Sequence, residues 1–525
     1  VEKIFRTAYD VNLGSAQANA TLLLDEESTQ LQQDCAALWI LICVEVLELE
    51  TVGSETVELS NNPSRKDFYL SSPEALKNLH ELILSQANSQ YSCIYLAWTY
   101  VLSRITAAAD QLKEIPSTYQ PFFHSLHPQK NRSYSKDQDS PHVEMCKACL
   151  GPDVGLFNLL HSLLTQSPLF VTAVAWKAAS TVTDPNAIAF RSVLKGLIMA
   201  LVELVPVELI PDFEGFIDVW IALFGRSESS SVTGICSQYW QSDWHNGISR
   251  RAVFDVARSR FPVQVQPLVR LLRSMTATGF LDTDPLSVST STGEPQVLTE
   301  ERDLCDQHVF YYFQHLTTFS QVIPISACTG PHALYERQTE RYGSNNASGL
   351  TYVNTRPIKL PGGSTLPARS QGRLLSGDGG DLMVLCWKHE HSGWKVLLEI
   401  LTDHVNRRRL HGNSGGSFQD ISFERRGPTT VKALRLEDIG VQIDPSGDDA
   451  TITDILDLLR SLIQDNPAQA QQLMLALEEG DSVVSHTMTE AQAPDLVQLT
   501  TMVLEEALTR SGGQARYLPI THLVT

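Results

Sequence analysis

Apolar residues recur along most of this chain at the three- and four-residue spacing of amphipathic helices. Leu268, Leu271, Leu272 and Met275 fall at i, i+3, i+4 and i+7, which places them on one face of a helix. The run YSCIYLAWTYVLSRI at 91–105 is mostly apolar and predicts a helix that is buried on most sides. Further helical segments are expected at 36–49, 154–164, 187–205, 213–225, 308–323, 453–463, 468–479 and 495–510.

Helices that each carry a single apolar stripe are stable when they stack in pairs, which is the solenoid arrangement. Candidate pairs recur at roughly 40-residue spacing, in the range of HEAT and armadillo repeats. No repeated consensus accompanies this spacing, so the repeat rests on the pattern alone. We expect a mainly α fold, a right-handed α-solenoid of HEAT/armadillo-like helical repeats, over 1–345 and again over 451–525. A compact all-α domain is the alternative, and the chain length makes it less favourable.

The hydrophobic period changes to two near Gly349. Five strands are expected, LTYVN, RPIKL, GRLLS, LMVLCWK and WKVLLEIL, with the turn-rich stretches PGGST and SGDGGD between them. Such a set predicts one inserted small SH3-like β-barrel at 346–402, whose closure would leave no exposed edge. We expect this barrel to be a self-contained insert, joined to the helices at two nearby ends. Residues 403–450 are expected to form a flexible linker.

Composition narrows the classes of function. The net charge of −20 argues against a nucleic-acid-binding surface, which needs clustered Lys and Arg. The nine cysteines are scattered and odd in number, which favours free thiols in a reducing compartment over a disulfide framework. The most apolar run, 36–49, is too short to span a bilayer and contains Glu45. The chain begins at Val1 and is expected to be a fragment without a secretory signal.

The strongest chemical candidate is the pair Cys146 and Cys149 in the sequence CKAC. His142, His127 and His124 precede it, so a zinc site of the Cys/His type can be drawn. A redox pair would need a βαβ context, which the helical surroundings do not offer. We favour two free thiols over a zinc-binding module, and the zinc module stays open as an alternative.

The second candidate is His389-Glu390-His391, in which both histidines share one face if the strand continues through them. Zinc needs three or four ligands, and no others are evident nearby. A polar hairpin turn is the favoured interpretation. The stretch SGDGGD at 376–381 lacks the Lys and the following helix of a phosphate loop, so we expect a turn.

A third candidate is Ser414 in GNSGG, which matches the Gly-x-Ser-x-Gly pattern of a hydrolase nucleophile. That pattern needs a strand before it and a helix after it, whereas Ser414 follows a polar stretch. His404 and His411 are close only in sequence. A flexible loop is favoured, and the arginines at 407–409 are expected to be part of a solvated linker. The chain therefore carries no complete catalytic set, and we expect no enzyme and no cofactor.

Trp387 and Trp394 flank the polar break 388–393. Exposed aromatic residues line the proline-peptide groove of ligand-binding SH3 domains. Large aromatic rings also dominate the cores of small domains. We favour packing of both rings, which makes the barrel a structural insert rather than a ligand reader.

Three segments together resemble the large inner-ring scaffold nucleoporins of the nuclear pore complex, the 188 kDa class. They are YLAWTYVL (95–102), ARSRFPVQVQPLVRLLRSM (257–275), and GLTYVNTRPIKLPGGSTLPARSQG (349–372) followed by VLCWKHEHSGWKVL (384–397). Their order and spacing also agree with this family. The resemblance covers 150–404 well, 90–110 moderately and the two ends weakly. The stretches 113–150 and 403–450 have no counterpart.

The resemblance implies an α-solenoid with an inserted SH3-like barrel and a structural role in the pore, supporting nucleocytoplasmic transport. It implies a nuclear-envelope location and other nucleoporins as partners, including the inner-ring adaptor nucleoporin through regions outside this fragment. FG repeats or transport factors are further candidate partners. An importin-like transport receptor is the alternative function, because it shares the acidic helical-repeat character. The resemblance carries over no binding residues.

Overall fold

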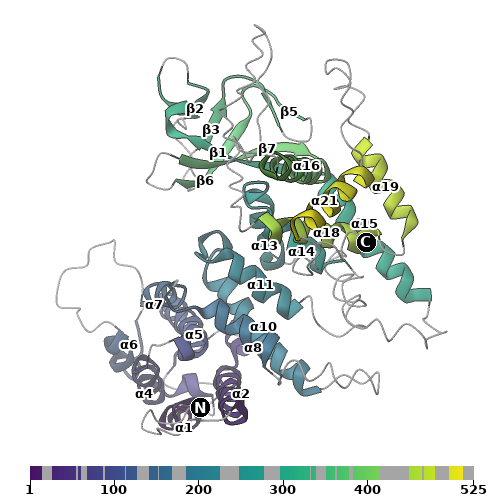
Figure 1. The fold of residues 1–525 in the computed structure, drawn as a ribbon. Coiled ribbons are helices and arrows are strands. Elements are labelled where there is room, and N and C mark those ends of the chain that lie inside the picture. Colours follow the sequence, from purple (N-terminus) through teal and green to yellow (C-terminus); the bar gives the residue numbers. More distant parts are fainter. Residues whose placement is uncertain are drawn as a thin grey trace. The chain divides into compact units, whose positions relative to one another are not determined.

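A computed structural model describes twenty stretches of the chain. They are 1–14, 26–54, 57–60, 65, 68–86, 89–112, 114–126, 141–151, 153–167, 169, 185–224, 248–276, 296–330, 333–338, 351–360, 364–377, 382–412, 448–463, 466–478 and 496–511. The fold is mostly helical with a small antiparallel sheet, so the expectation of a mainly α fold is confirmed at that level. The chain divides into two compact units, Val1–Glu228 and Ser229–Thr525 (Figure 1).

The regular elements that the structure describes in unit 1 are all helices. Its helices are α1 (Glu2–Asp10), α2 (Glu26–Glu45), α3 (Leu49–Ser54), α4 (Pro73–Leu84), α5 (Ser92–Asp110), α6 (Gln120–Leu126), α7 (Pro141–Cys149), α8 (Leu156–Gln166), α10 (Pro185–Leu204) and α11 (Phe213–Phe224). Short 3-10 turns lie at Asn12–Gly14, Tyr69–Ser71, Ser89–Tyr91 and Val207–Leu209.

Helix α5 is the core of unit 1, as its apolar sequence predicts. It contacts α2, α3, α4, α7 and α10. Trp98 is fully buried on α5, and its Nε1 donates a hydrogen bond to Nδ1 of the buried His80 on α4 at 3.0 Å. Tyr100 donates from its hydroxyl to Glu203 on α10 at 2.5 Å. These polar contacts satisfy side chains that would otherwise be costly to bury beside so much apolar surface.

Unit 2 combines helices with all the strands that the structure describes. Its elements are α13 (Ile248–Arg260), α14 (Gln266–Ser274), α15 (Gln296–Gln314), β1 (Leu316–Pro324), η7 (Ile325–Cys328), β2 (Tyr335–Gln338), β3 (Thr351–Asn354), β4 (Ile358–Lys359), β5 (Thr365–Leu366), β6 (Gln371–Gly377), β7 (Leu382–His391), α16 (Gly393–Gly412), α18 (Asp448–Ile463), α19 (Pro467–Glu478) and α21 (Leu496–Ser511). The expected face of α14 is confirmed, because Leu268, Leu271, Leu272 and Met275 are all buried.

The strands form a five-stranded antiparallel sheet in the order β1-β7-β6-β3-β2, and β4 pairs with β5 in a separate two-stranded ribbon. The two edge strands, β1 and β2, are consecutive in the chain and are joined through η7. Their side chains meet inside the sheet, where Gln321 of β1 bonds to Tyr335 of β2. The sheet therefore curls on itself, although the ladder given by the described residues does not close.

The first correction concerns residues 308–323, which we expected to be one helix. Helix α15 ends at Gln314, and Leu316–Pro324 is instead the edge strand β1. β1 pairs along its length with β7, from Leu316 opposite His391 to Pro324 opposite Leu382. The β-branched run in LTTFSQVI favours a strand, and the long-range partner supplies the hydrogen bonds. The sheet thus begins thirty residues before the expected boundary at 345/346, which falls between β2 and β3.

The second correction concerns WKVLLEIL, which we expected to be the last strand. These residues open the helix α16, and Ser392 caps it by accepting from the Lys395 N–H at 3.5 Å. Trp394, Leu397, Leu401 and Val405 are buried on one face. Their spacing of three and four residues is helical, so the alternation that suggested a strand was misread.

The third correction concerns the linker expected at 403–450. Helix α16 runs on to Gly412, and α18 begins at Asp448 rather than at Thr453. The flexible-linker prediction for 413–447 lies outside the described residues. Glycine 225, the expected end of the helix at 213–225, also lies outside them.

The sheet contacts the helices at more places than the two nearby ends that we expected. Ser320 in β1 donates its backbone N–H to the carbonyl of Phe261 at 2.9 Å. Its hydroxyl donates to the Arg260 carbonyl at 2.6 Å and accepts from the Val263 N–H at 3.1 Å. Thr318 donates its hydroxyl to the carbonyl of Arg258 at 3.3 Å. The end of α13 and the turn after it thereby contact the outer edge of β1 and satisfy the backbone N–H of Ser320.

Gly372 in β6 lies directly opposite Trp387 in β7, and a Cβ at this position would stand 2.7 Å from Cε3 of that indole. We expect Gly372→Ala to destabilise unit 2 by roughly 1–3 kcal/mol, since the ring is held on every side and cannot move away. Chemical denaturation with a probe in unit 2 measures this change.

Gly196 in α10 is the matched control, because a Cβ there meets nothing within 4 Å. Gly196→Ala should stabilise the chain by about 0.4–1 kcal/mol, as expected for an alanine in an unobstructed helix. Equal effects of the two substitutions would contradict the tight contact between Gly372 and Trp387.

Candidate functional site

The interior of the sheet is filled by a polar-aromatic cluster rather than by an open groove. Trp387 is fully buried, and its Nε1 donates to Oε1 of Gln321 at 3.1 Å. The same Gln321 donates from Nε2 to the hydroxyl of Tyr335 at 3.1 Å. The Tyr335 and Trp387 rings lie 5.7 Å apart. One amide therefore ties three strands together, β1, β2 and β7.

Trp394 is also buried, but it belongs to the helices rather than to the sheet. Its ring packs edge-on against Phe313 at 4.7 Å and stacks on Phe310 at 5.9 Å. Its Nε1 donates to the carbonyl of Phe310 at 3.2 Å. Gly393 lies so close to Phe313 that a Cβ would stand 2.7 Å from the ring. The expected burial of both tryptophans is confirmed, but only Trp387 packs inside the sheet, and neither ring offers a peptide-binding surface.

His391 lies at the junction of sheet and helices, within the candidate His-Glu-His. It is 5% exposed, stacked on Phe261 at 6.4 Å and edge-on to Phe319 at 5.3 Å. Its Nδ1 is 3.3 Å from the carbonyl oxygen of His389, which can only accept, so the neutral ring carries its proton on Nδ1. Burial lowers the pKa of His391 to about 4.

The other two members of this motif face different surroundings. Burial also lowers the pKa of His389, against the opposing effect of Glu390. Glu390 is exposed and lies 3.1 Å from Nδ1 of His315. All three residues belong to β7, so the prediction of a hairpin turn at this motif is wrong. The strand continues because its partner β1 reaches His391.

Cys146 and Cys149 lie on α7, buried against α5. Cys149 donates from Sγ to the carbonyl oxygen of Ser92 at 3.7 Å. Burial raises the pKa of Cys146 to about 11, and it raises that of Cys149 further, with added repulsion from Cys146 and Cys93. A metal-binding or nucleophilic cysteine needs an easily formed thiolate, and these surroundings oppose one.

The remaining sequence candidates do not converge on these thiols. His142 lies on α7 and His124 is exposed on α6, whereas His127 is outside the described residues. Across the stretches that the structure describes, no three His, Cys, Asp or Glu residues gather so that they could hold a metal ion.

The hydrolase-like candidates are separated in the same way. Ser414 lies outside the described residues, while His404 is buried on α16 and His411 is near the end of that helix. The arginines at 407–409 belong to α16 and not to a linker. In the stretch SGDGGD, residues 378–381 are not described.

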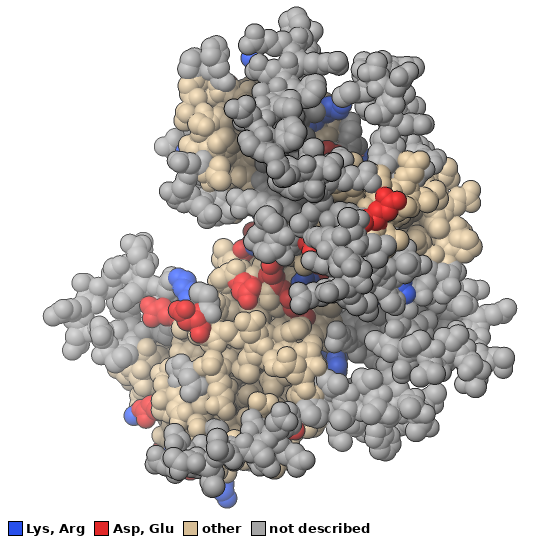
Figure 2. All heavy atoms as spheres, viewed as in Figure 1, with Lys and Arg blue, Asp and Glu red and all other residues tan. Residues whose placement is uncertain are grey.

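The described residues on the face drawn in Figure 2 form no basic patch of the kind that binds nucleic acid. On the described part of the face in Figure 2, basic side chains (blue) are isolated from one another and acidic ones (red) lie among them. None of the helices in the described stretches combines the length and the apolar character that a membrane crossing requires.

Sequence reasoning missed the residues that organise this junction, namely Gln321, Tyr335, Ser320 and Phe261. Gln321 is 2% exposed although glutamine is usually a surface residue. The available signal was its place inside a run of β-branched and aromatic residues, where a lone amide needs buried partners.

A comparison of the chain with models of known protein families and with curated proteins finds no match.

Burial of the two α7 thiols predicts slow alkylation in the native protein. At pH 8, roughly one part in a thousand of the Cys146 thiol is ionised if its pKa is about 11. Cys146 and Cys149 should therefore react at least about tenfold more slowly with iodoacetamide than the half-buried Cys35. Peptide mass spectrometry of timed samples measures the rates. Faster labelling of Cys146 than of Cys35 would contradict the buried-thiol interpretation.

The neutral His391 predicts a loss of stability in acid. Its folded pKa of about 4 is below the ordinary value of 6.5, so the folded state resists protonation. The contribution is fully present above pH 6.5 and is lost as the pH falls toward 4, by on the order of 3 kcal/mol.

His391→Phe should remove this part of the acid sensitivity while keeping an aromatic ring between Phe261 and Phe319. At pH 8 the variant should match the native chain within about 1.5 kcal/mol, and below pH 6 the variant should become the more stable of the two. Denaturant titrations across this pH range test it. If the free energy of unfolding fell with pH equally in the two chains, a buried neutral His391 would be contradicted.

Proposed function

We propose that this chain is part of a large inner-ring scaffold nucleoporin and that its role is structural. In this proposal the helices form a right-handed α-solenoid of HEAT/armadillo-like repeats, and the curled sheet is an SH3-like barrel carried within it. The chain acts through protein–protein contacts at the nuclear pore, in support of assembly and nucleocytoplasmic transport. It is not an enzyme.

The observation that carries the proposal is a small antiparallel sheet held between two helices of an otherwise helical chain. β1 follows α15 after one residue, and α16 follows β7 after one residue. This is the arrangement that the sequence resemblance implies. Residues that carry the resemblance also take part in the packing. Gly372 lies against the ring of Trp387, and Trp394 packs between α15 and α16.

The character of the interior supports a structural role over a catalytic or ligand-binding one. The aromatic and amide side chains of the sheet bond to each other and are buried, as is Trp394. The α7 thiols are buried with raised pKa values. These side chains therefore contribute to packing, as expected of a scaffold domain.

The partners in this proposal are other nucleoporins. The inner-ring adaptor nucleoporin would bind through regions outside this chain, and FG repeats or transport factors would be further contacts. The location is the nuclear envelope. An importin-like transport receptor is the second candidate, supported by the acidic helical character and opposed by the sheet. A zinc-binding module at Cys146 and Cys149 is the third, and the raised pKa values oppose it.

Two measurements on the whole chain separate the first two candidates. In cells, the chain fused to a fluorescent protein should collect at the nuclear rim and recover slowly after photobleaching, whereas a transport receptor should recover within seconds. Binding of the purified chain to individual purified nucleoporins should identify a direct scaffold partner. The fluorescent protein alone is the control. Diffuse distribution together with no nucleoporin binding would contradict the proposal.

A further inference from the structure

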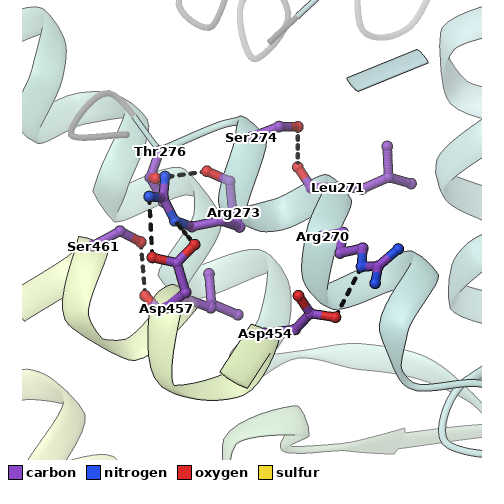
Figure 3. Close-up of polar contacts among 9 residues, drawn as sticks. Arg270, Leu271, Arg273, Ser274, Thr276, Asp454, Asp457 and Ser461 are labelled. Atoms are coloured by element: carbon purple, nitrogen blue, oxygen red, sulfur yellow. Dashed lines mark hydrogen bonds and ion pairs between the residues drawn. The ribbon is translucent and has the colours of Figure 1, made fainter. Parts of the chain in front are cut away.

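Two arginines of α14 face two aspartates of α18 across 184 residues of sequence. Arg270 Nε lies 2.8 Å from Oδ2 of Asp454, and Arg273 Nε lies 2.7 Å from Oδ2 of Asp457. Arg273 also donates from Nη2 to Oδ1 of Asp457 at 3.2 Å, which makes that pair bidentate. Figure 3 shows both pairs bridging the two helices.

The spacing of these pairs fixes how α18 sits on α14. Both the arginines and the aspartates are three residues apart, and they pair in the same order along the two helices. A slip of α18 by one helical turn would leave at most one pair formed. A rotation of α18 about its axis would break both. The two pairs therefore select a single register.

Apolar burial supplies the attraction but not the register, since it has no direction. The apolar side chains of α18 that pack inward are Ile452, Ile455, Leu456, Leu458, Leu459 and Leu462, and each is at most 6% exposed. They face the buried leucines of α14, which contacts α18 directly. Such aliphatic surfaces fit one another in several ways, so the charged pairs decide among them.

The helices after α18 also pack against the helices of unit 2 that precede residue 413. α19 contacts α15 and α16, and α21 contacts α16. In Figure 1, α18, α19 and α21 lie together on one side of unit 2, with the strands on the other. We name α18, α19 and α21 the C-terminal module, and α14, α15 and α16 its docking surface.

We propose that the C-terminal module is an intramolecular ligand, which its docking surface recognises through α18, an acidic amphipathic helix with aspartates at i and i+3. Recognition then depends on the two surfaces and not on the covalent connection through residues 413–447. The module should stay bound after that connection is cut. This inference does not depend on the proposed function, because it concerns how unit 2 holds its own last helices.

The test uses the full chain with a site for a specific protease inserted between residues 430 and 431. After folding and cleavage, size-exclusion chromatography reports whether the two pieces travel together. The two pieces of the chain without further substitutions should co-elute as one complex. Separation of the pieces at micromolar concentration would overturn the proposal.

Charge reversal tests the role of the register. In the cleaved chain, Asp457→Arg should weaken binding of the C-terminal module at least about tenfold, because it places a second positive charge beside Arg273. The exchange Arg273→Asp with Asp457→Arg restores an opposite pair and should recover most of the lost retention. Lys77→Glu, which breaks an exposed pair with Glu81 in unit 1, is the matched control and should have no effect.

Two outcomes would overturn the charged register. One is a reversal that leaves retention unchanged, and the other is an exchange that fails to restore retention although the uncut chain folds. If the reversal prevents folding, the salt dependence of the native cut complex decides instead. Retention should weaken several-fold between about 0.1 and 0.5 M salt, and a constant value would overturn the proposal.

Discussion

The pairing of β1 with β7 is the constraint on which the rest of unit 2 depends. It joins segments that begin 66 residues apart, Leu316–Pro324 and Leu382–His391. Because β1 follows α15 and β7 precedes α16, the same ladder brings those two helices together. The outer edge of β1 is bonded to the turn after α13 through Ser320. One strand thus connects the sheet to the helices at the level of the backbone.

Because the sheet is connected to the helices in this way, polar and aromatic side chains are buried in its interior, whereas a ligand-binding domain would expose some of them. Gln321 uses its amide to hold Trp387 and Tyr335, and that leaves the amide no role toward an outside partner. His391 is neutral because it is enclosed by Phe261 and Phe319, on either side of the junction. Such an interior fits the structural role that we propose for the chain.

The sequence predicted what depends on local periodicity and missed what depends on distant partners. Leu268 and its neighbours on α14 follow the helical spacing, and their burial follows directly from it. β1 was misread because its hydrogen-bond partner lies far along the chain, and α16 because a short apolar run fits either period. The burial of Trp387 was foreseen from its size, whereas the pairing of Arg273 with Asp457 has no local signal.

The most direct test of this account is hydrogen exchange of the native chain under mild denaturant. If β1 couples the sheet to the helices, amides of β1, β7, α13 and α16 should lose protection together, at one free energy of opening. Peptides from Leu316–Pro324 and Gly393–Gly412 report on the two sides of the junction. Opening of the strands at a clearly lower free energy, with the helices still protected, would contradict the account and return the sheet to the status of a separate insert.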